Sequence, residues 1–192
     1  MIACFKKSLY RKSILILLLS IVLGAMTLPG AHRGSPASDL NTKVAQIDID
    51  NARLDDLIRL FGNPVRYIWS EEILDPKDLS KRHAYVIDYG GGFHIFMVQG
   101  RVMELRFEQN SPYVYQGRLR IGDSIDNALK VMGAPQKTVV GEKLTFENGV
   151  LYRDIEGRKG YGYYHRADQN LRLFFADDRI TAIYVTRSDY RG

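Results

Sequence analysis

Cysteine is almost absent from this chain of 192 residues, and its single copy, Cys4, lies close to the N-terminus. The residues after Cys4 therefore hold no disulfide, no thiolate nucleophile and no cysteine metal ligand. Histidine is also scarce: the four copies are His32, His83, His94 and His165, and no two are spaced by two or four residues. Histidine metal sites commonly use such spacings. The sequence thus predicts no metal ion and no cofactor.

Net charge is missing once the N-terminus is set aside. The whole chain has 27 basic and 22 acidic residues, which gives a net charge of +5. Residues 1–33 hold five basic residues and no acidic one, so the rest of the chain has 22 of each sign. A protein that binds nucleic acid needs clustered excess positive charge. The balance therefore excludes nucleic acid as the expected partner.

Residues 1–30 combine a basic start with an apolar run. Four basic residues and no acidic one precede residues 14–26, which hold no charge. A basic segment followed by roughly 7–15 apolar residues is typical of a secretory signal peptide, and about 20 are needed to cross a bilayer. We therefore expect a signal peptide. A retained anchor over residues 13–28 stays open, because neither Ala25 nor Ala31 completes a small-x-small cleavage site.

The rest of the chain contains one pattern twice. Residues 51–64 align with residues 122–135, so that a Gly-x-Pro triplet falls at the end of each segment. Both segments place apolar residues at the spacing of one helix face. Glycine then allows the left-handed conformation that ends a helix, and proline prevents its continuation. We expect two short helices, with Asn51 as the N-cap of the first and Asp123 or Ser124 as that of the second.

Alternating apolar segments follow each expected helix. We expect strands at 84–89, 93–98 and 101–108 in the first copy, and at 161–165, 171–175 and 179–186 in the second. Shorter strands at 44–49 and 117–121 are expected to lead into the helices. The fold class is therefore α+β, with two repeats of a short helix plus a three-stranded antiparallel meander. The expected organisation is a flexible linker over 31–43, repeat one over 44–116 and repeat two over 117–192.

A helix that ends in Gly-x-Pro, followed by a meander that closes on a strand such as residues 179–186, resembles the small outer-membrane lipoprotein modules of the BamE (SmpA/OmlA) type. Two such modules in tandem are similar to the β-lactamase-inhibitor-protein architecture. The resemblance covers roughly residues 47–187 and implies an exported protein that binds other proteins through its sheet and loops. No lipid-attachment cysteine follows the apolar run, so lipoprotein status does not transfer.

An esterase is the one enzyme that the sequence suggests, and it is disfavoured. Residues 122–125 read Gly-Asp-Ser-Ile, which matches the nucleophile block of GDSL-type esterases. That chemistry requires a histidine beside Ser124, which an Asp-x-x-His motif usually provides, and none follows. Helix capping explains Asp123 and Ser124 without any nucleophile. We therefore expect a non-catalytic protein.

Alternation along the strands assigns side chains to two faces of the sheet. The core face receives Ile95, Met97, Met103, Leu105, Phe107, Leu171, Leu173, Phe175, Ile183 and Val185. The other face receives Val98, Val102, Glu104, Ala176, Ile180, Ala182 and six candidate binding residues: His94, Phe96, Arg106, Arg172, Phe174 and Tyr184. Aromatic residues mixed with arginine are typical of interface centres. Cover by the chain itself, through an insertion within residues 140–160 or through the linker, is an equal alternative.

The sequence therefore predicts an extracytoplasmic protein, periplasmic or secreted, that binds another protein of the cell envelope. Its only expected membrane contact is through the N-terminal segment. The alternative is a small-molecule-binding protein that uses the face between the two repeats, with Phe96, Arg172 and Phe174 lining the site.

Overall fold

The computed structural model describes residues 36–70, 72–141, 144–146, 149–152, 156–166 and 169–187. All of these residues belong to one compact unit, Ser35–Gly192. The signal peptide or anchor expected within residues 1–30 lies outside the described residues.

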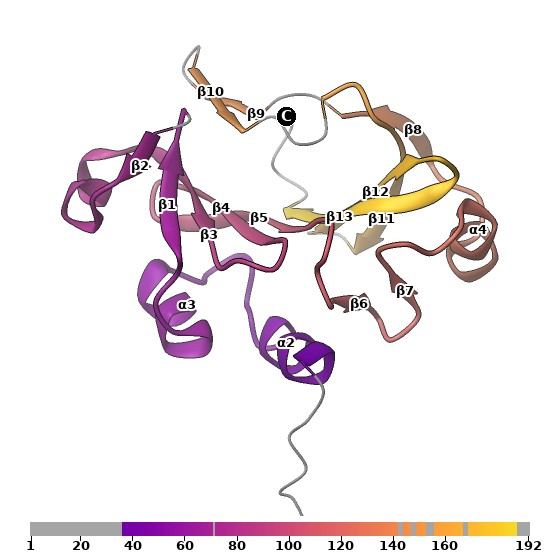
Figure 1. Cartoon of the computed structure of the whole chain (residues 1–192), viewed down its shortest axis with the longest axis horizontal. Helices are drawn as coiled ribbons and strands as arrows, with labels where there is room; N and C mark the ends of the chain where they lie inside the picture. Colours follow the sequence, from indigo (N-terminus) through magenta and orange to yellow (C-terminus); the bar gives the residue numbers. More distant parts are fainter. Residues whose placement is uncertain are drawn as a thin grey trace, which may run out of the picture. The chain divides into compact units, whose positions relative to one another are not determined.

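A large antiparallel sheet dominates this unit (Figure 1). Among the described residues, nine strands form it in the order β2-β1-β3-β4-β5-β13-β12-β11-β8. Their bounds are β1 (Arg66–Trp69), β2 (Glu72–Leu74), β3 (Ala84–Asp88), β4 (Phe93–Val98), β5 (Arg101–Phe107), β8 (Lys137–Val140), β11 (Lys159–Arg166), β12 (Gln169–Ala176) and β13 (Arg179–Arg187). Two hairpins lie outside it: β6 (Val114–Tyr115) with β7 (Leu119–Arg120), and β9 (Leu144–Phe146) with β10 (Gly149–Tyr152). The expected α+β class with an antiparallel sheet is confirmed.

Three α-helices and one 3-10 helix accompany the sheet in the described residues: α2 (Pro36–Val44), α3 (Leu54–Phe61), α4 (Ile125–Met132) and η1 (Pro76–Lys81). The helices expected from the repeated pattern are α3 and α4. Each ends at a glycine with positive φ, 82° at Gly62 and 76° at Gly133. The amide of each glycine donates to the carbonyl four residues earlier at 2.8 Å. The Gly-x-Pro triplets end the helices as expected, but ψ is −168° at Gly62 and −163° at Gly133, so both glycines adopt an extended conformation with positive φ, which is accessible almost only to glycine, and not the expected left-handed helical one.

The N-caps differ between α3 and α4. The Ser124 hydroxyl caps α4 by accepting the Asn127 amide at 3.1 Å, as expected. For α3 the cap is Arg53, whose backbone amide donates to the Asp56 carboxylate at 3.0 Å, and not Asn51. The Asn51 side chain donates instead to Asp48, because the chain turns there before the helix begins.

Helix α2 occupies residues that the sequence analysis assigned to a flexible linker and to a strand. It runs from Pro36 to Val44, and a turn rather than a strand follows it. Leu40, Val44 and Ile47 pack against the main apolar core. These contacts with distant residues stabilise a segment whose own composition is largely polar, which is why local patterning missed it.

Helix α3 is followed by five strands of the sheet and α4 by four, where the sequence analysis expected three after each helix. Helix α3 precedes β1, β2, β3, β4 and β5, and α4 precedes β8, β11, β12 and β13. The additional strands, β1, β2 and β8, are three or four residues long and largely exposed or half-buried. They lack the long apolar alternation that made the other strands visible. Strands β5 and β13 join the two sets, with Val185 paired to Leu105.

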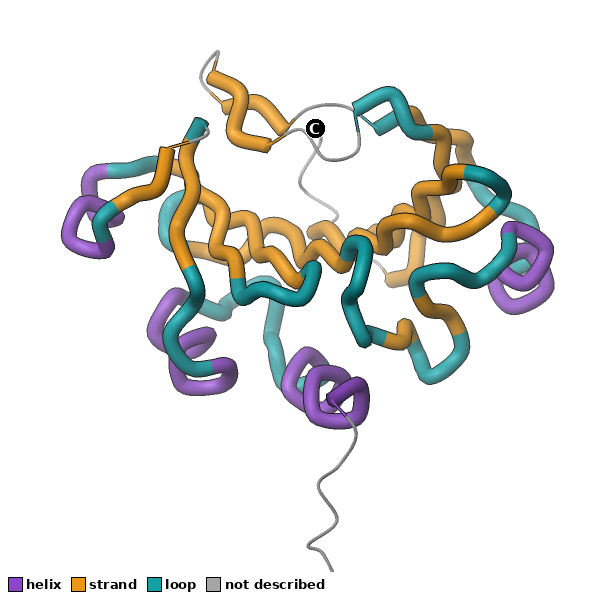
Figure 2. The backbone as a smooth tube through the Cα atoms, viewed as in Figure 1, coloured by secondary structure: helices purple, strands orange, loops and turns teal. Residues whose placement is uncertain are grey.

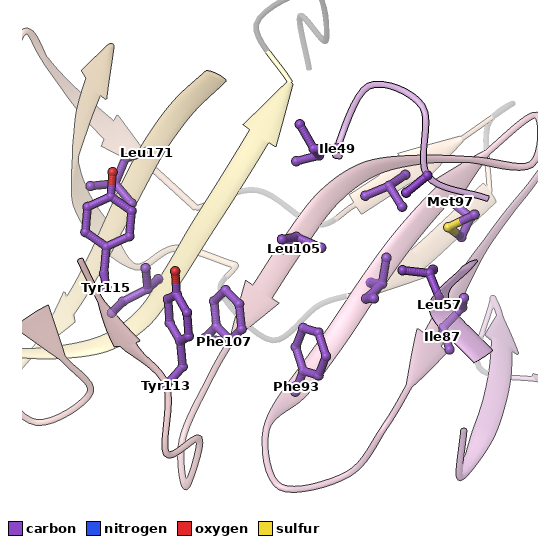
Figure 3. Packing of buried hydrophobic residues seen from close by; sticks show 14 of the residues in the cluster. Ile49, Leu57, Ile87, Phe93, Met97, Leu105, Phe107, Tyr113, Tyr115 and Leu171 are labelled. Carbon is purple, nitrogen blue, oxygen red and sulfur yellow. The ribbon is translucent and has the colours of Figure 1, made fainter. Parts of the chain in front are cut away.

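The main core lies between the sheet and α2, α3, α4 and the β6–β7 hairpin, which share one side (Figure 2). We call this side the helix face. Its fully buried side chains include Leu57 of α3 and Ile87, Met97 and Phe107 of the sheet (Figure 3). The opposite side, here the second face, carries two smaller clusters of buried residues, which are Ala84, Val86 and Phe96, and Phe174, Ala182 and Tyr184.

Two β-bulges correct the expected assignment of side chains to faces. The register shifts by one residue between Phe96 and Met97, and again between Phe174 and Phe175. A bulge places one extra residue in a strand and reverses the alternation beyond it. Val102 and Ile180 therefore lie in the core of the helix face, whereas Met103 packs against the second face.

Candidate functional site

The six candidate binding residues lie together on the second face. His94, Arg106, Tyr184 and Arg172 form one row across β4, β5, β13 and β12, because each is paired directly with the next. Phe96 lies two residues beyond His94 on β4, and Phe174 lies two residues beyond Arg172 on β12. The alternation of side chains along the strands therefore assigned these six residues to the same face of the sheet on which the structure has them.

Five of the six candidates are buried. The exposed fraction is 0% for Phe96, 1% for Phe174 and Tyr184, 4% for Arg106 and 8% for His94. Arg172 is half-buried. Direct contact of the five with a partner therefore requires the second face to be opened.

A polar network occupies the middle of the row. Arg106 Nε donates to Glu104 Oε1 at 2.6 Å, and the guanidinium lies 4.6 Å from the centre of the Tyr184 ring. The Tyr184 hydroxyl donates to Glu108 Oε1 at 2.7 Å, and the Thr186 hydroxyl donates to the second oxygen of Glu104. Each of these side chains is at most 6% exposed. The network is therefore a buried one, in which each polar group needs its partner.

His94 lies between two carboxylates at one end of this network. Its Nε2 atom is 3.4 Å from Asp88 Oδ1, and its Nδ1 atom is 3.7 Å from Glu108 Oε2. Asp88 also accepts from Arg66 Nε at 2.8 Å and from the Gly90 amide at 2.7 Å. Within the described residues no cluster of three potential ligands has a geometry that holds a metal ion.

The surroundings fix the charge states of two members of the row. Burial raises the pKa of Tyr184 well above its ordinary value, although Arg106 opposes the rise. Burial disfavours the charge of Arg106, but the carboxylates of Glu104 and Glu108 outweigh it and its pKa is raised. At neutral pH Tyr184 is thus a neutral donor and Arg106 a cation. The charge of Arg106 is balanced by the carboxylates of Glu104 and Glu108. Both Arg106 and Tyr184 keep their protons at neutral pH, so neither is available as a base there.

Sequence reasoning missed Asp88, Glu108 and Thr186. All three lie within the expected strands 84–89, 101–108 and 179–186, but the assignment of side chains to faces did not include them. Thr186 is 0% exposed. The pairing register of the strands would have revealed two of these residues, because Asp88 pairs with His94 and Thr186 pairs with Glu104.

Arg172 differs from the rest of the row. Its Nε atom is buried and has no hydrogen-bond partner in the part of the chain that the structure describes. Its neighbours across the sheet are Tyr184 and Gly162. A Cβ at Gly162 would lie 2.8 Å from the Lys137 side chain. The glycine therefore gives Lys137 room over β11, near Arg172.

The β9–β10 hairpin lies on the side of the sheet opposite the helices (Figure 1), and β10 contacts β1 and β3. It falls within residues 140–160, the insertion that the sequence analysis named as possible cover.

Comparison with known proteins gives no relative. No family model, no curated protein and no solved structure matches the chain. Among the described residues, no helix has both the length and the apolar character required to span a membrane.

Proposed function

We propose that residues 44–116 and 117–192 are two copies of one unit, each a short helix followed by a meander. Three correspondences support this. The helices end at equivalent glycines, Gly62 and Gly133. One isolated β-bridge joins Arg53 to Arg101, and another joins Ser124 to Arg179. The residues of the first bridge align with those of the second in the repeated pattern. The two β-bulges fall at aligned positions. On this proposal the chain resembles tandem BamE-type modules, as in the β-lactamase-inhibitor-protein architecture.

We propose further that the chain is an exported, non-catalytic module that binds another protein of the cell envelope. The observation that carries the proposal is the exposure of two large apolar side chains on the second face, Ile73 at 70% and Tyr164 at 59%. Ile73 pairs with Ile68, which packs on the Phe96 cluster. Tyr164 lies two residues after Gly162, which is paired with Arg172. Both side chains therefore point to the second face.

The two exposed residues extend an apolar and aromatic surface beyond its buried part. Ile73 lies on β2 and Tyr164 on β11, near opposite edges of the sheet. Lys137 Nζ lies 5.6 Å from the centre of the Tyr164 ring, which is within cation–π range. Contiguous apolar patches rimmed by polar groups are typical of protein contact sites, and on this proposal Ile73 and Tyr164 mark the two ends of such a patch.

Photo-crosslinking in the native cell tests the proposal. Phe96 and Phe174 are unsuitable positions because they are buried, so the crosslinking residue replaces Ile73 in one variant and Tyr164 in another. The matched control replaces Lys130, which is exposed on α4 at the helix face. We expect an adduct with the same protein from Ile73 and Tyr164, and none from Lys130. Absence of an adduct at both positions in an exported, folded protein refutes binding through this face.

A further inference from the structure

A cleft on the helix face lies over the joint between β5 and β13. Its volume is about 380 Å³, and its floor includes Leu105 and Val185, which are paired across that joint. One wall is α2 with the residues that follow it, and the other is the segment 113–117. The Val114 amide donates to the Asn41 side chain at 3.0 Å and ties the two walls together. The volume is within the range of small-molecule sites, roughly 300–1,000 Å³.

None of the described residues that line the cleft has a charged side chain. Its apolar members lie mostly on α2, on the residues that follow it, and on β5 and β13, and its polar side chains are Asn41, Tyr113, Tyr115 and Gln116. An ionised ligand group would lose its water here without gaining an opposite charge, which is costly. The composition thus favours an uncharged ligand with a large apolar part.

One polar group in this lining has no partner. Tyr113 is 8% exposed, and its ring stacks on Phe107 with 3.6 Å between ring centres. Among the described residues, no group donates a hydrogen bond to its hydroxyl or accepts one from it, although its backbone amide bonds to Ser111. Burial raises the pKa of Tyr113 well above its ordinary value, so the hydroxyl keeps its proton. Figure 3 shows the Tyr113 ring beside the Phe107 ring.

We propose that this cleft binds one small uncharged amphiphile, whose apolar part lies between α2 and segment 113–117 and whose polar group accepts a hydrogen bond from Tyr113. A stacked ring holds the donor in place before binding, which reduces the ordering cost. The Tyr113 hydroxyl borders the cleft and is not a buried orphan, so water satisfies it in the free protein and a ligand oxygen takes the place of that water. The site is on the opposite side of the sheet from Ile73 and Tyr164, so it is independent of the proposed partner surface.

The test measures binding of decan-1-ol and of decanoate to the protein as the cell produces it, purified without detergent. Two-dimensional NMR titration gives the affinity and the residues affected. We expect saturable binding of one decan-1-ol with shifts at Val44, Tyr113 and Val185, and at least tenfold weaker binding of decanoate. No saturable binding, or tighter binding of decanoate, overturns the proposal.

Two variants locate the site. Ala45→Phe fills the cleft from an exposed position and should abolish saturable binding, whereas Ala134→Phe, at an exposed alanine outside the cleft, should leave it unchanged. Tyr113→Phe keeps the stacked ring and removes one hydrogen bond, so decan-1-ol should bind about fivefold more weakly. Unchanged binding in Ala45→Phe contradicts the site. Unchanged binding in Tyr113→Phe contradicts the assigned donor.

Discussion

Replacing Arg106 with methionine tests whether the polar network of the second face is a buried one. Arg106 is 4% exposed and Glu104 is 2% exposed, and their side chains are 2.6 Å apart. The substitution removes the guanidinium and leaves the Glu104 carboxylate with the Thr186 hydroxyl as its remaining side-chain donor among the described residues. Breaking a buried ion pair from one side costs about 3–5 kcal/mol, because the other charge stays desolvated. In a chain of this size that corresponds to a fall in Tm of roughly 10 °C.

Chemical denaturation followed by the fluorescence of Trp69, the single tryptophan, measures this loss. The informative control is the double variant Arg106→Met/Glu104→Gln. Glutamine still accepts from Thr186 but carries no charge, so the double variant should be more stable than Arg106→Met alone by about 2 kcal/mol. A loss below about 1 kcal/mol in Arg106→Met refutes the reasoning, because that is the range of solvated pairs. A double variant no more stable than the single one refutes it also.

Two further predictions concern the turn after β3 and the buried tyrosines. Gly91→Ala and Gly92→Ala both place alanine at positive φ, but only at Gly92 does the Cβ meet a backbone oxygen, that of Gln109 at 2.5 Å. Gly92→Ala should therefore be less stable by about 1–3 kcal/mol in urea unfolding, and equal losses contradict the geometry. Burial raises the pKa of Tyr85 to about 12, and that of Tyr163 in the same direction. The unfolded chain loses these protons first, so stability is complete below pH 10 and falls between about pH 10 and 12. Phenolate absorbance should rise together with unfolding, and titration of every tyrosine near pH 10 in the folded protein contradicts this.

The parts of the fold that the sequence predicted are those with a local physical signal. Helices α3 and α4 combine an apolar stripe with a glycine and a proline at their ends, so neighbouring residues determine them. Strands β4 and β12 are six and eight residues long and rich in apolar and aromatic residues, so their composition reveals them. Helix α2 has no such signal, because it depends on contacts of Leu40 and Val44 with residues far along the chain.

The bulges and the burial of the candidate site could not be predicted for a related reason. Met103 and Thr181, which occupy the extra positions at the bulges, are ordinary strand residues with no preference for irregular backbone. Their effect on Val102 and Ile180 appears only when the partner strand fixes the register. Burial of Phe174 likewise depends on which segments approach the second face, and strand alternation carries no information about them.

The amino-acid composition of the second face does not show whether it is an interface or a polar interior. The hydrogen-bond partners of its polar side chains distinguish the two. Both environments exclude water, so both favour aromatic rings and arginine with satisfied hydrogen bonds. Arg106 and Tyr184 find their acceptors, Glu104 and Glu108, within the same chain, which makes their part of the row interior. Arg172 is half-buried, and its Nε atom is buried without a hydrogen-bond partner among the residues that the structure describes. On the proposed function, a binding partner therefore engages the β11–β12 side of the face before any other part of the row, and the Arg172 side chain must move before its Nε atom can donate to that partner.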